Sequence, residues 1–310
     1  MPLHRFRFAA MASVHEILLA AESAAQAERA AAAAITDVQR IERKYSRYRD
    51  DSLTSAINRA AGGGRVPIDA ETAALLHYAH RCHALSDGRF DVTSGVLRRV
   101  WDFRARPPRL PSATQVDAAR ALIGWERVQW SDRDIRLPLP GMELDFGGIG
   151  KEYAADRAAT ICRDQGIEHV LVNLGGDVRA LGGREASTPW RIGIRHPRIE
   201  SATLHIVELV GGAVATSGDY ERYFEVDGRR YSHVLDARTG WPVAHWQSIT
   251  VSAPFAILAG SYATIGMLAG DGAIAFLERL GVRYVAVAAD GTLCAAPSSR
   301  ARSVAPATAP

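Results

Sequence analysis

The stretch ELDFGGIGKEYAADRAA, residues 143–159, joins a strand-like segment to a helix through a glycine-rich turn. The segment before the turn ends in Asp145, and Lys151 falls in the first turn of the helix. Backbone N–H groups at a helix start, the positive end of the helix dipole and a lysine together suit a phosphorylated ligand. A turn that only connects a strand to a helix would show the same pattern, so both interpretations are kept.

Two standard phosphate-binding patterns do not fit this stretch. Asp145 stands where the Walker A pattern needs glycine, and Glu152 stands where that pattern needs Ser or Thr. The GxGxxG pattern of dinucleotide-binding sheets does not fit the stretch either. The turn is therefore neither a P-loop nor a Rossmann turn.

The sequence before the turn predicts two long helices and a loop. An alanine-rich segment over residues 22–48 has apolar side chains near helical spacing and predicts an amphipathic helix. A second helix is expected over residues 69–85, with Asp69 as its N-cap and Asp87-Gly88 as its stop. The segment RARPPRLPSA, rich in proline and arginine, predicts a boundary or a long surface loop.

The sequence after that loop is rich in β-forming residues. Short strands are expected over residues 125–131, 134–139 and 142–148. After a helix over residues 151–165 come seven more strand-like stretches, HVLVNLGG, WRIGIRHP, ATLHIVELV, AVATSG, RYFEVDG, RRYSHVLD and SITVSA. Helices over residues 256–268 and 272–280 and the strand VRYVAVAA follow. Because the strands form meanders interrupted by helices and do not alternate strictly with them, we predict an α+β fold.

Composition excludes several classes of protein. The 310 residues include 37 basic and 34 acidic side chains, a net charge of +3, which is too close to balance to predict a nucleic-acid partner. The three cysteines, Cys82, Cys162 and Cys294, are too far apart for a CxxC motif, and no disulfide scaffold is expected. No apolar run approaches the roughly 20 residues of a membrane helix, so no membrane span is expected.

The two ends of the chain are expected to lie outside the packed core. The N-terminus has a basic start and a mildly apolar stretch, but His15 and Glu16 interrupt what would be the core of a signal peptide. We therefore expect a cytoplasmic protein, with the periplasm as the alternative. The expected organisation is a flexible N-terminus over residues 1–10, a single domain over residues 11–295 and a disordered tail over residues 296–310.

Three further segments contain side chains suited to chemistry. VNLGGDVRALGG, residues 172–183, opens a strand into glycines that let a backbone approach a ligand closely. SDGRFDVTSG, residues 86–95, places an aromatic ring beside opposite charges, which suits a nucleotide and equally suits a packed loop. SHVLDARTG, residues 232–240, contains His233, which is either a base near neutral pH or a hydrogen-bonded strand residue.

Taken in order, these segments resemble the ApbE family, the FAD:protein FMN transferases. The resemblance rests on the motifs SRYRDDSLTSAIN, DGRFDVTSG, LDFGGIGKEYAADRAA, VNLGGDVRALG, ATSGDYER and SHVLDARTGWPV, followed by a helix that ends in ATIGMLAG. They run in a constant order from about residue 11 to about residue 290. The resemblance implies an α+β fold with a T-fold-like core, in which helices pack on a mixed or antiparallel sheet.

The resemblance also implies a reaction. Family members bind FAD, coordinate Mg²⁺ at its pyrophosphate and transfer the FMN half to a Ser or Thr hydroxyl of a target protein, releasing AMP. The residues that the resemblance places against FAD are Met11, Tyr48, Arg89, Phe90, Asp91, Asp145, Lys151 and Val234. It makes His233 the base that activates the incoming hydroxyl, and it makes Thr264 and the carbonyl of Gly148 ligands of the metal. The sequence indicates neither which protein is the acceptor nor the oligomeric state.

Three positions depart from the family pattern. Ala12 stands where the pattern has glycine. Glu152 follows Lys151 where the pattern also has glycine, and its carboxylate weakens the case for a phosphate-binding lysine unless the side chain points to solvent, which the rotation from one helical residue to the next allows. Gly260 stands four residues before Thr264, where the pattern has a metal-binding Asp.

The glycine at position 260 leaves two outcomes open, and a third outcome does not depend on this glycine. The metal is held without that acid, with help from Ser261 or from another carboxylate such as Asp177 or Asp219. Otherwise the protein binds or sequesters FAD with little turnover. In the third outcome water replaces the acceptor hydroxyl, which makes the protein an FAD pyrophosphatase that produces FMN and AMP.

Overall fold

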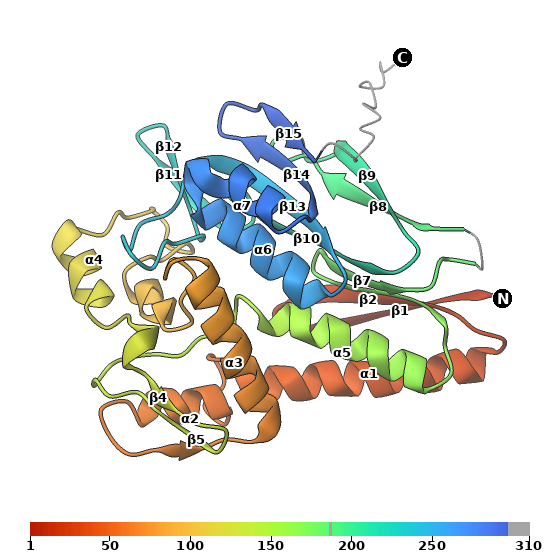
Figure 1. The fold of residues 1–310 in the computed structure, drawn as a ribbon, viewed down its shortest axis with the longest axis horizontal. Helices are drawn as coiled ribbons and strands as arrows, with labels where there is room; N and C mark the ends of the chain where they lie inside the picture. Colours follow the sequence, from red (N-terminus) through yellow and green to blue (C-terminus); the bar gives the residue numbers. More distant parts are fainter. Residues whose placement is uncertain (186–187, 297–310) are drawn as a thin grey trace.

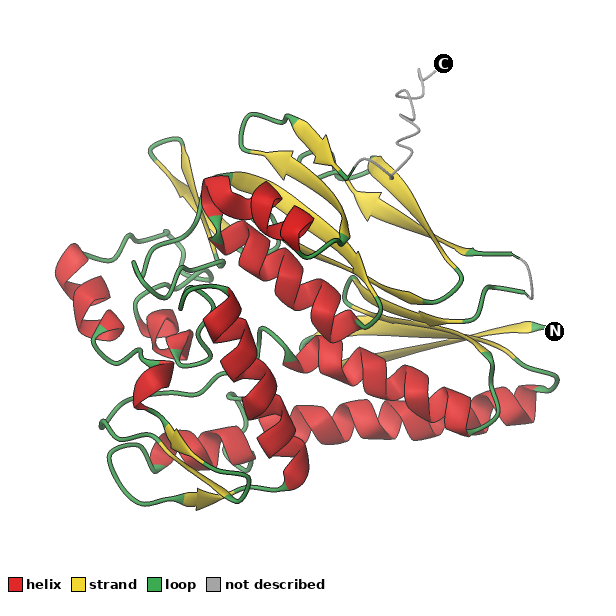
Figure 2. Cartoon of the chain, viewed as in Figure 1, coloured by secondary structure: helices red, strands yellow, loops and turns green. Residues whose placement is uncertain are grey.

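The computed structural model describes residues 1–185 and 188–296. An eight-stranded sheet forms its centre, with strand order β1-β2-β6-β7-β10-β13-β14-β15 and every neighbouring pair antiparallel (Figure 1). The strands are β1 (Leu3–Ala10), β2 (Ser13–Ala20), β6 (His169–Leu174), β7 (Asp177–Leu181), β10 (Gly212–Gly218), β13 (Trp246–Ala253), β14 (Arg283–Ala288) and β15 (Leu293–Ala295). Helices and strands occupy separate layers (Figure 2), and the predicted α+β class is confirmed.

Helices cover one face of the sheet. They are α1 (Ala24–Tyr45), α5 (Gly150–Asp164), α6 (Ala256–Leu268) and α7 (Ala273–Arg279), with the 3₁₀ turn η3 (Gly270–Gly272) between the last two. In Figure 1, α6, α5 and α1 lie side by side, with α6 against β10 and β13 and α5 against β6 and β7. Alanines such as Ala30, Ala34, Ala155 and Ala159 occupy the buried faces of α1 and α5. These small side chains let the two helices approach each other closely.

A hairpin covers part of the other face of the sheet. It consists of β8 (Trp190–Arg195) and β9 (Thr203–Leu209). The hairpin and the sheet share an apolar cluster made of Leu18, Leu171, Val178, Ala180, Trp190, Leu209 and Val214. Because successive residues of a strand point to opposite faces, the middle strands are apolar on both sides. This explains why HVLVNL in β6 is an almost continuous apolar run.

A second group of elements lies beside the large sheet. Its helices are α2 (Leu53–Arg59), α3 (Ala70–Leu85) and α4 (Ala113–Arg120), with the 3₁₀ helices η1 (Ser94–Arg99) and η2 (Trp125–Arg127). Its strands are β3 (Val66–Pro67), β4 (Gln129–Trp130) and β5 (Asp134–Arg136), and the hairpin of β11 (Tyr223–Val226) and β12 (Arg229–Ser232) adjoins them. The rings of Trp101, Phe224 and Tyr231 stack with centroids 5.6–6.1 Å apart and connect the end of η1 to this hairpin.

Several predicted helices are confirmed close to their predicted ends. α6 has the predicted bounds, and α3 begins after Asp69, whose side chain accepts a hydrogen bond from the Thr72 N–H at 3.0 Å. The helix predicted over residues 22–48 is α1, capped by Ser23. The helix predicted over residues 151–165 is α5. No helix among residues 1–185 and 188–296 is both long and apolar enough to span a membrane.

Two predictions about the fold are wrong. Residues 1–10, expected to be flexible, contain β1, which pairs with β2 along all eight of its residues. The strand expected over residues 142–148 is irregular, because Leu144 exchanges backbone hydrogen bonds with the Asn58 side chain and not with a neighbouring strand. The tail predicted over residues 296–310 lies outside the described residues except for its first residue.

The turn between β1 and β2 places two residues with side chains in the left-handed region of backbone space. Met11 has φ 48° and Ala12 has φ 59°. Ala10 pairs with Ser13, so the two residues form a two-residue hairpin turn, a geometry that favours glycine or asparagine. A β-carbon in this region costs on the order of 1 kcal/mol. The alanine that departs from the family pattern is therefore strained.

We expect Ala12→Gly to raise the free energy of unfolding by about 0.5–1 kcal/mol, because glycine adopts a positive φ without steric cost. Urea denaturation measures the change. The matched control is Ala32→Gly at an exposed position inside α1, where the same substitution should lower the free energy of unfolding by about 1 kcal/mol. A loss of stability in both variants would show that the turn is not strained.

Candidate active site

The start of α5 brings backbone N–H groups and a lysine to one place. The turn before it runs through Gly147 and Gly148, and the N-cap residue is Ile149, whose side chain has no hydrogen-bonding atom. The Gly150 N–H donates to the Phe146 carbonyl at 2.7 Å, whereas the N–H groups of Lys151 and Glu152 have no backbone acceptor among the described residues and are left for a ligand or for solvent. Lys151 follows within the first turn, at the positive end of the helix dipole.

Asp177 holds the side chain of Lys151. The Nζ atom lies 2.8 Å from Oδ2 of Asp177, the first residue of β7. Burial opposes the positive charge of Lys151, but the carboxylates of Asp177 and Glu152 outweigh it and raise the pKa of the lysine. A β-carbon on Gly175 would lie 3.2 Å from Oγ of Ser13 and 3.6 Å from Nζ of Lys151. The β6–β7 turn and the start of β2 therefore meet at this lysine.

Two arginines contact Asp145 on the other side of the glycine turn. Its Oδ2 lies 3.1 Å from Nη1 of Arg47 and 3.4 Å from Nε of Arg98. Its Oδ1 accepts a hydrogen bond from the Gly147 N–H at 2.8 Å. A β-carbon on Gly95 would lie 2.8 Å from Nη1 of Arg47, so glycine is needed there for the guanidinium to come so close. The end of α1, η1 and the glycine turn are thus joined by one charged group.

His233 lies close to the same charges. Its Nδ1 is 3.3 Å from the carbonyl oxygen of Arg222. Because a carbonyl oxygen only accepts hydrogen bonds, Nδ1 holds the hydrogen and Nε2 keeps its lone pair. Burial and the positive charges of Arg98 and Arg222 lower the pKa of His233 to about 4, and Lys151 adds to this effect. The imidazole is therefore neutral at pH 7 and able to accept a proton.

The Glu152 side chain points at α6 and not to solvent, so the condition set from the sequence, an acid that points away from the Lys151 site, is not met. Only 7% of Glu152 is exposed. A β-carbon on Gly260 would lie 2.6 Å from both Cγ and Oε1 of Glu152. The acid therefore fills the space that a side chain at position 260 would occupy. Burial and the charge of Asp177 raise the pKa of Glu152.

The helices α5 and α6 run antiparallel to each other. The two carboxylate oxygens of Asp156 accept hydrogen bonds from the N–H groups of Ala256 and Ile257, at 2.9 and 3.0 Å, and so cap the start of α6. Glu152 lies one turn before Asp156 in α5. It contacts Gly260, which lies one turn after Ala256 in α6. The two contacts define one register between the helices.

The same register leads to the expected metal ligands. Gly148 lies four residues before Glu152, in the glycine turn ahead of α5, and Thr264 lies one turn after Gly260 on the same face of α6. A β-carbon on Gly148 would lie 3.0 Å from the Phe90 ring, so the backbone of the turn packs tightly at this point. The pairing of Gly148 with Thr264 as metal ligands stays a prediction.

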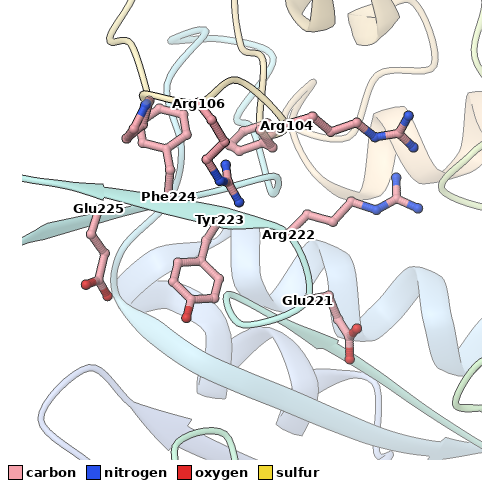
Figure 3. Close-up of a pocket in the computed structure, with 9 residues that line it drawn as sticks. Arg104, Arg106, Glu221, Arg222, Tyr223, Phe224 and Glu225 are labelled. Carbon is pink, nitrogen blue, oxygen red and sulfur yellow. The ribbon is translucent and has the colours of Figure 1, made fainter.

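A cavity of about 510 Å³ adjoins the candidate base (Figure 3). It is lined by Phe103, Arg104, Arg106, Pro108, Glu221, Arg222, Tyr223, Phe224 and Glu225. In Figure 3 the guanidinium groups of Arg104 and Arg222 extend in the same direction. Arg222 lines the cavity, and its carbonyl oxygen lies within hydrogen-bond reach of His233. The cavity therefore borders the candidate base.

The sequence profile of the ApbE family matches residues 11–287. The chain belongs to the ApbE family. Among its curated relatives, the FAD:protein FMN transferase of Salmonella typhimurium is 35% identical over 233 residues, which are 73% of this chain and 67% of the relative. The FAD:protein FMN transferase of Vibrio cholerae is 33% identical over 238 residues, which are 76% of this chain and 71% of the relative.

Solved structures of ApbE proteins have the same fold. The crystal structure of the ApbE protein from Thermotoga maritima superposes with a TM-score of 0.87 at 32% identity, over 96% of this chain and 98% of that one. The apo form of the flavinyl transferase ApbE from Pseudomonas stutzeri gives a TM-score of 0.85 at 31% identity, over 96% of this chain and 95% of that one. The family and the transferase class predicted from the motifs are confirmed.

The residues that the ApbE pattern places against FAD divide into two groups. In the first group, Asp145, Lys151 and Phe90 border the glycine turn. Met11 lies in the strained β1–β2 turn, where its N–H donates to the Glu42 carboxylate at 2.7 Å. Tyr48 is 73% exposed. These side chains border open space or the α5 start.

The second group is held within the protein. Oδ1 of Asp91 accepts hydrogen bonds from the N–H and the hydroxyl of Thr93, both at 2.7 Å, and Oδ2 accepts one from the Trp125 N–H at 3.0 Å. Asp91 therefore organises its own loop. Val234 is buried and Arg89 is half-buried. Contacts of these residues with FAD stay predictions.

Sequence analysis missed the arginines of the site. Arg47, Arg98 and Arg222 act on Asp145 and His233, but none of them was singled out. The chain has 37 basic residues, and no local sequence pattern distinguishes these three arginines from the others. Only the folded chain shows which of them face the glycine turn.

We expect the His233 imidazole to stay neutral down to about pH 5 in the FAD-free protein, since its pKa is about 4. An unfolded histidine has a pKa of about 6.5, so the unfolded chain binds more protons between pH 6.5 and 4. The stability contributed by this residue is therefore full above pH 6.5 and is lost as the pH falls toward 4. An NMR titration of the imidazole measures the pKa, and the signal that is missing in His233→Ala identifies the His233 resonance. A titration midpoint near pH 6.5 would contradict the expectation.

Proposed function

We propose that this protein transfers the FMN half of FAD to a Ser or Thr hydroxyl of an acceptor protein and releases AMP. The observation that supports this most is the meeting of three features at one site: the open start of α5, the Lys151 ammonium and the neutral His233 imidazole. Relatives at 33–35% identity have the name FAD:protein FMN transferase. Anion binding and proton acceptance are the two abilities that this reaction needs.

The start of α5 is where the FAD pyrophosphate would bind. Its open N–H groups donate hydrogen bonds, and the helix dipole favours negative charge there. The 2.8 Å contact with Asp177 orients the Lys151 ammonium before the substrate arrives. Arg47 and Arg98 lie on the far side of the turn, where Asp145 and Glu143 offset part of their positive charge. The site is thus organised for a diphosphate in the absence of the substrate.

In the transfer step the acceptor hydroxyl oxygen forms a bond to the phosphorus on the FMN side. The bond from that phosphorus to the bridging oxygen breaks, and its electron pair leaves with AMP. The hydroxyl proton moves to Nε2 of His233, which is free because Nδ1 donates to the Arg222 carbonyl. A hydroxyl is a poor nucleophile at neutral pH, so a base within hydrogen-bond reach matters for the rate.

The residues around the glycine turn fit Mg²⁺, which takes oxygen ligands. The Thr264 hydroxyl and the Gly148 carbonyl come from facing segments and would hold the ion together with pyrophosphate oxygens. In addition, Oε2 of the buried Glu152 has no hydrogen-bond partner among the described residues. When bound, the ion supplies charge that neutralises the phosphate oxygens.

The test of the proposal is an acceptor assay. The purified protein is incubated with FAD, Mg²⁺ and a domain that presents a flavinylation Ser or Thr, and both AMP and covalent flavin are measured. Formation of both in equal amounts supports transfer. Free FMN and AMP without acceptor would identify a pyrophosphatase, and tight FAD binding with neither product would identify a flavin-sequestering protein.

We expect His233→Ala to reduce the transfer rate by roughly 10²–10⁴-fold, the usual contribution of a general base, with little change in FAD affinity. Rates of covalent flavin formation and FAD binding by fluorescence quenching measure the two effects. His77→Ala is the matched control, since His77 is exposed and paired with Asp132. If FAD affinity falls together with the rate, His233 has a structural role.

We expect Lys151→Ala to weaken FAD binding by at least about tenfold, because it removes the cation at the pyrophosphate. The chain has only one other lysine, Lys44 in the last turn of α1, whose ammonium is held by Asp69 and Glu71 and not by the residues of the glycine turn. Lys44→Ala is therefore a matched control that should leave FAD affinity unchanged. Equal FAD affinity in the wild type and in Lys151→Ala would refute the phosphate site.

A further inference from the structure

Glu152 and Gly260 are two of the positions at which this chain departs from the family pattern, and they touch each other. The pattern has glycine at position 152 and an acid at position 260, whereas this chain has the acid at 152 and glycine at 260. In space the two exchanges compensate, because the carboxylate lies where a β-carbon on Gly260 would be only 2.6 Å from it. Figure 1 shows the two helices, α5 and α6, side by side.

One oxygen of this acid lacks a partner. Oε2 of Glu152 is buried and makes no hydrogen bond within the part of the chain that the structure describes. A buried carboxylate oxygen in this state is costly unless a donor or a cation satisfies it. An ion that takes oxygen ligands would remove that cost.

The other carboxylates considered as substitutes are already engaged. Oxygens of Asp219 lie 2.7 Å from both terminal nitrogens of Arg198. Asp177 pairs with Lys151 at 2.8 Å. Oδ2 of Asp177 also lacks a hydrogen bond but is held in that ion pair, whereas Oε2 of Glu152 has neither a hydrogen bond nor an ion pair among the described residues. Of these three carboxylates, Glu152 is therefore the one whose oxygen has no positively charged neighbour in contact.

We propose that Glu152 provides the carboxylate ligand for Mg²⁺ in this protein, so that the metal-binding acid comes from α5 and not from α6. This inference rests on the proposed function, because the ion serves the same pyrophosphate site. Gly260 is then required for room, since a side chain there would displace the acid. The absence of an acid at position 260 does not leave the site without a carboxylate.

A consequence follows for the substitution that restores the family residue. Gly260→Asp places a β-carbon 2.6 Å from Cγ and Oε1 of Glu152 and a second negative charge beside the first. Alone, it should lower the melting temperature and fail to tighten metal binding. Combined with Glu152→Gly, it moves the acid back to α6 and removes the clash.

The test measures binding of Mn²⁺ alone to the full-length protein by electron paramagnetic resonance of the free ion. Glu152→Gln keeps the shape of the side chain and removes its charge, and it should weaken Mn²⁺ binding by at least about tenfold. The double variant Glu152→Gly/Gly260→Asp should bind Mn²⁺ within about threefold of the wild type. The rise in melting temperature on adding Mg²⁺ is a second readout and should follow the same order.

A matched control accounts for a second acidic cluster. His83, Asp91 and Glu126 offer ligand atoms within 4.8 Å of one another, and none of the three belongs to α5 or α6. Glu126→Gln makes the same chemical change as Glu152→Gln and should leave the Glu152-dependent binding unchanged. If Glu126→Gln lowers the amount of bound Mn²⁺ and Glu152→Gln does not lower that same part, then that part is bound at the cluster of His83, Asp91 and Glu126.

The outcome for Glu152→Gln decides the proposal. Mn²⁺ affinity equal to that of the wild type in a folded Glu152→Gln variant would overturn it, even if the acceptor assay shows flavin transfer. Mn²⁺ binding that depends on Glu152 in a protein that releases no AMP from FAD would support it and refute the proposed function. Failure of the folded double variant to regain Mn²⁺ affinity would also overturn it.

Discussion

The contact between α5 and α6 determines where the charged groups of the site lie. Asp156 caps α6, and one turn away Gly260 gives Glu152 room to lie between the two helices. The first turn of α5 continues directly into the glycine turn, so the positions of Lys151 and Gly148 depend on the same contact. A larger residue at position 260 would displace the Glu152 side chain from this place.

The charges around the glycine turn act on the substrate and on the base at the same time. Burial, together with the positive charges of Arg98 and Arg222, lowers the pKa of His233 and keeps its imidazole neutral, and the same positive charges would favour a bound anion. A neutral imidazole can accept the proton of a hydroxyl, whereas a charged one cannot. The net charge of the whole chain, only +3, gives no indication of this local concentration of positive charge.

Elements with a long periodic pattern could be predicted from the sequence, and irregular ones could not. The apolar spacing of α1, the Asp69 cap of α3 and the apolar run of α6 are local signals, and all three helices have nearly the predicted ends. Met142, Leu144 and Phe146 alternate as in a strand and are buried, but their segment is held by the Asn58 side chain. Alternation reports which side chains are buried, and it does not report where the backbone hydrogen bonds go. The strand β1 was missed for the opposite reason, because its alternating arginines resemble the basic start of a leader segment.

The sequence by itself determined the fold class, the family and the residue types of the site, because these are contained in short motifs whose order is fixed along the chain. Only the tertiary structure decided what the two exchanged residues do. Position along a helix tells which residues share its faces, but not which of those faces meets another helix. Glu152 and Gly260 are far apart in the chain. The contact that buries the acid, and that leaves no room for a side chain at position 260, therefore forms only when α5 and α6 pack against each other.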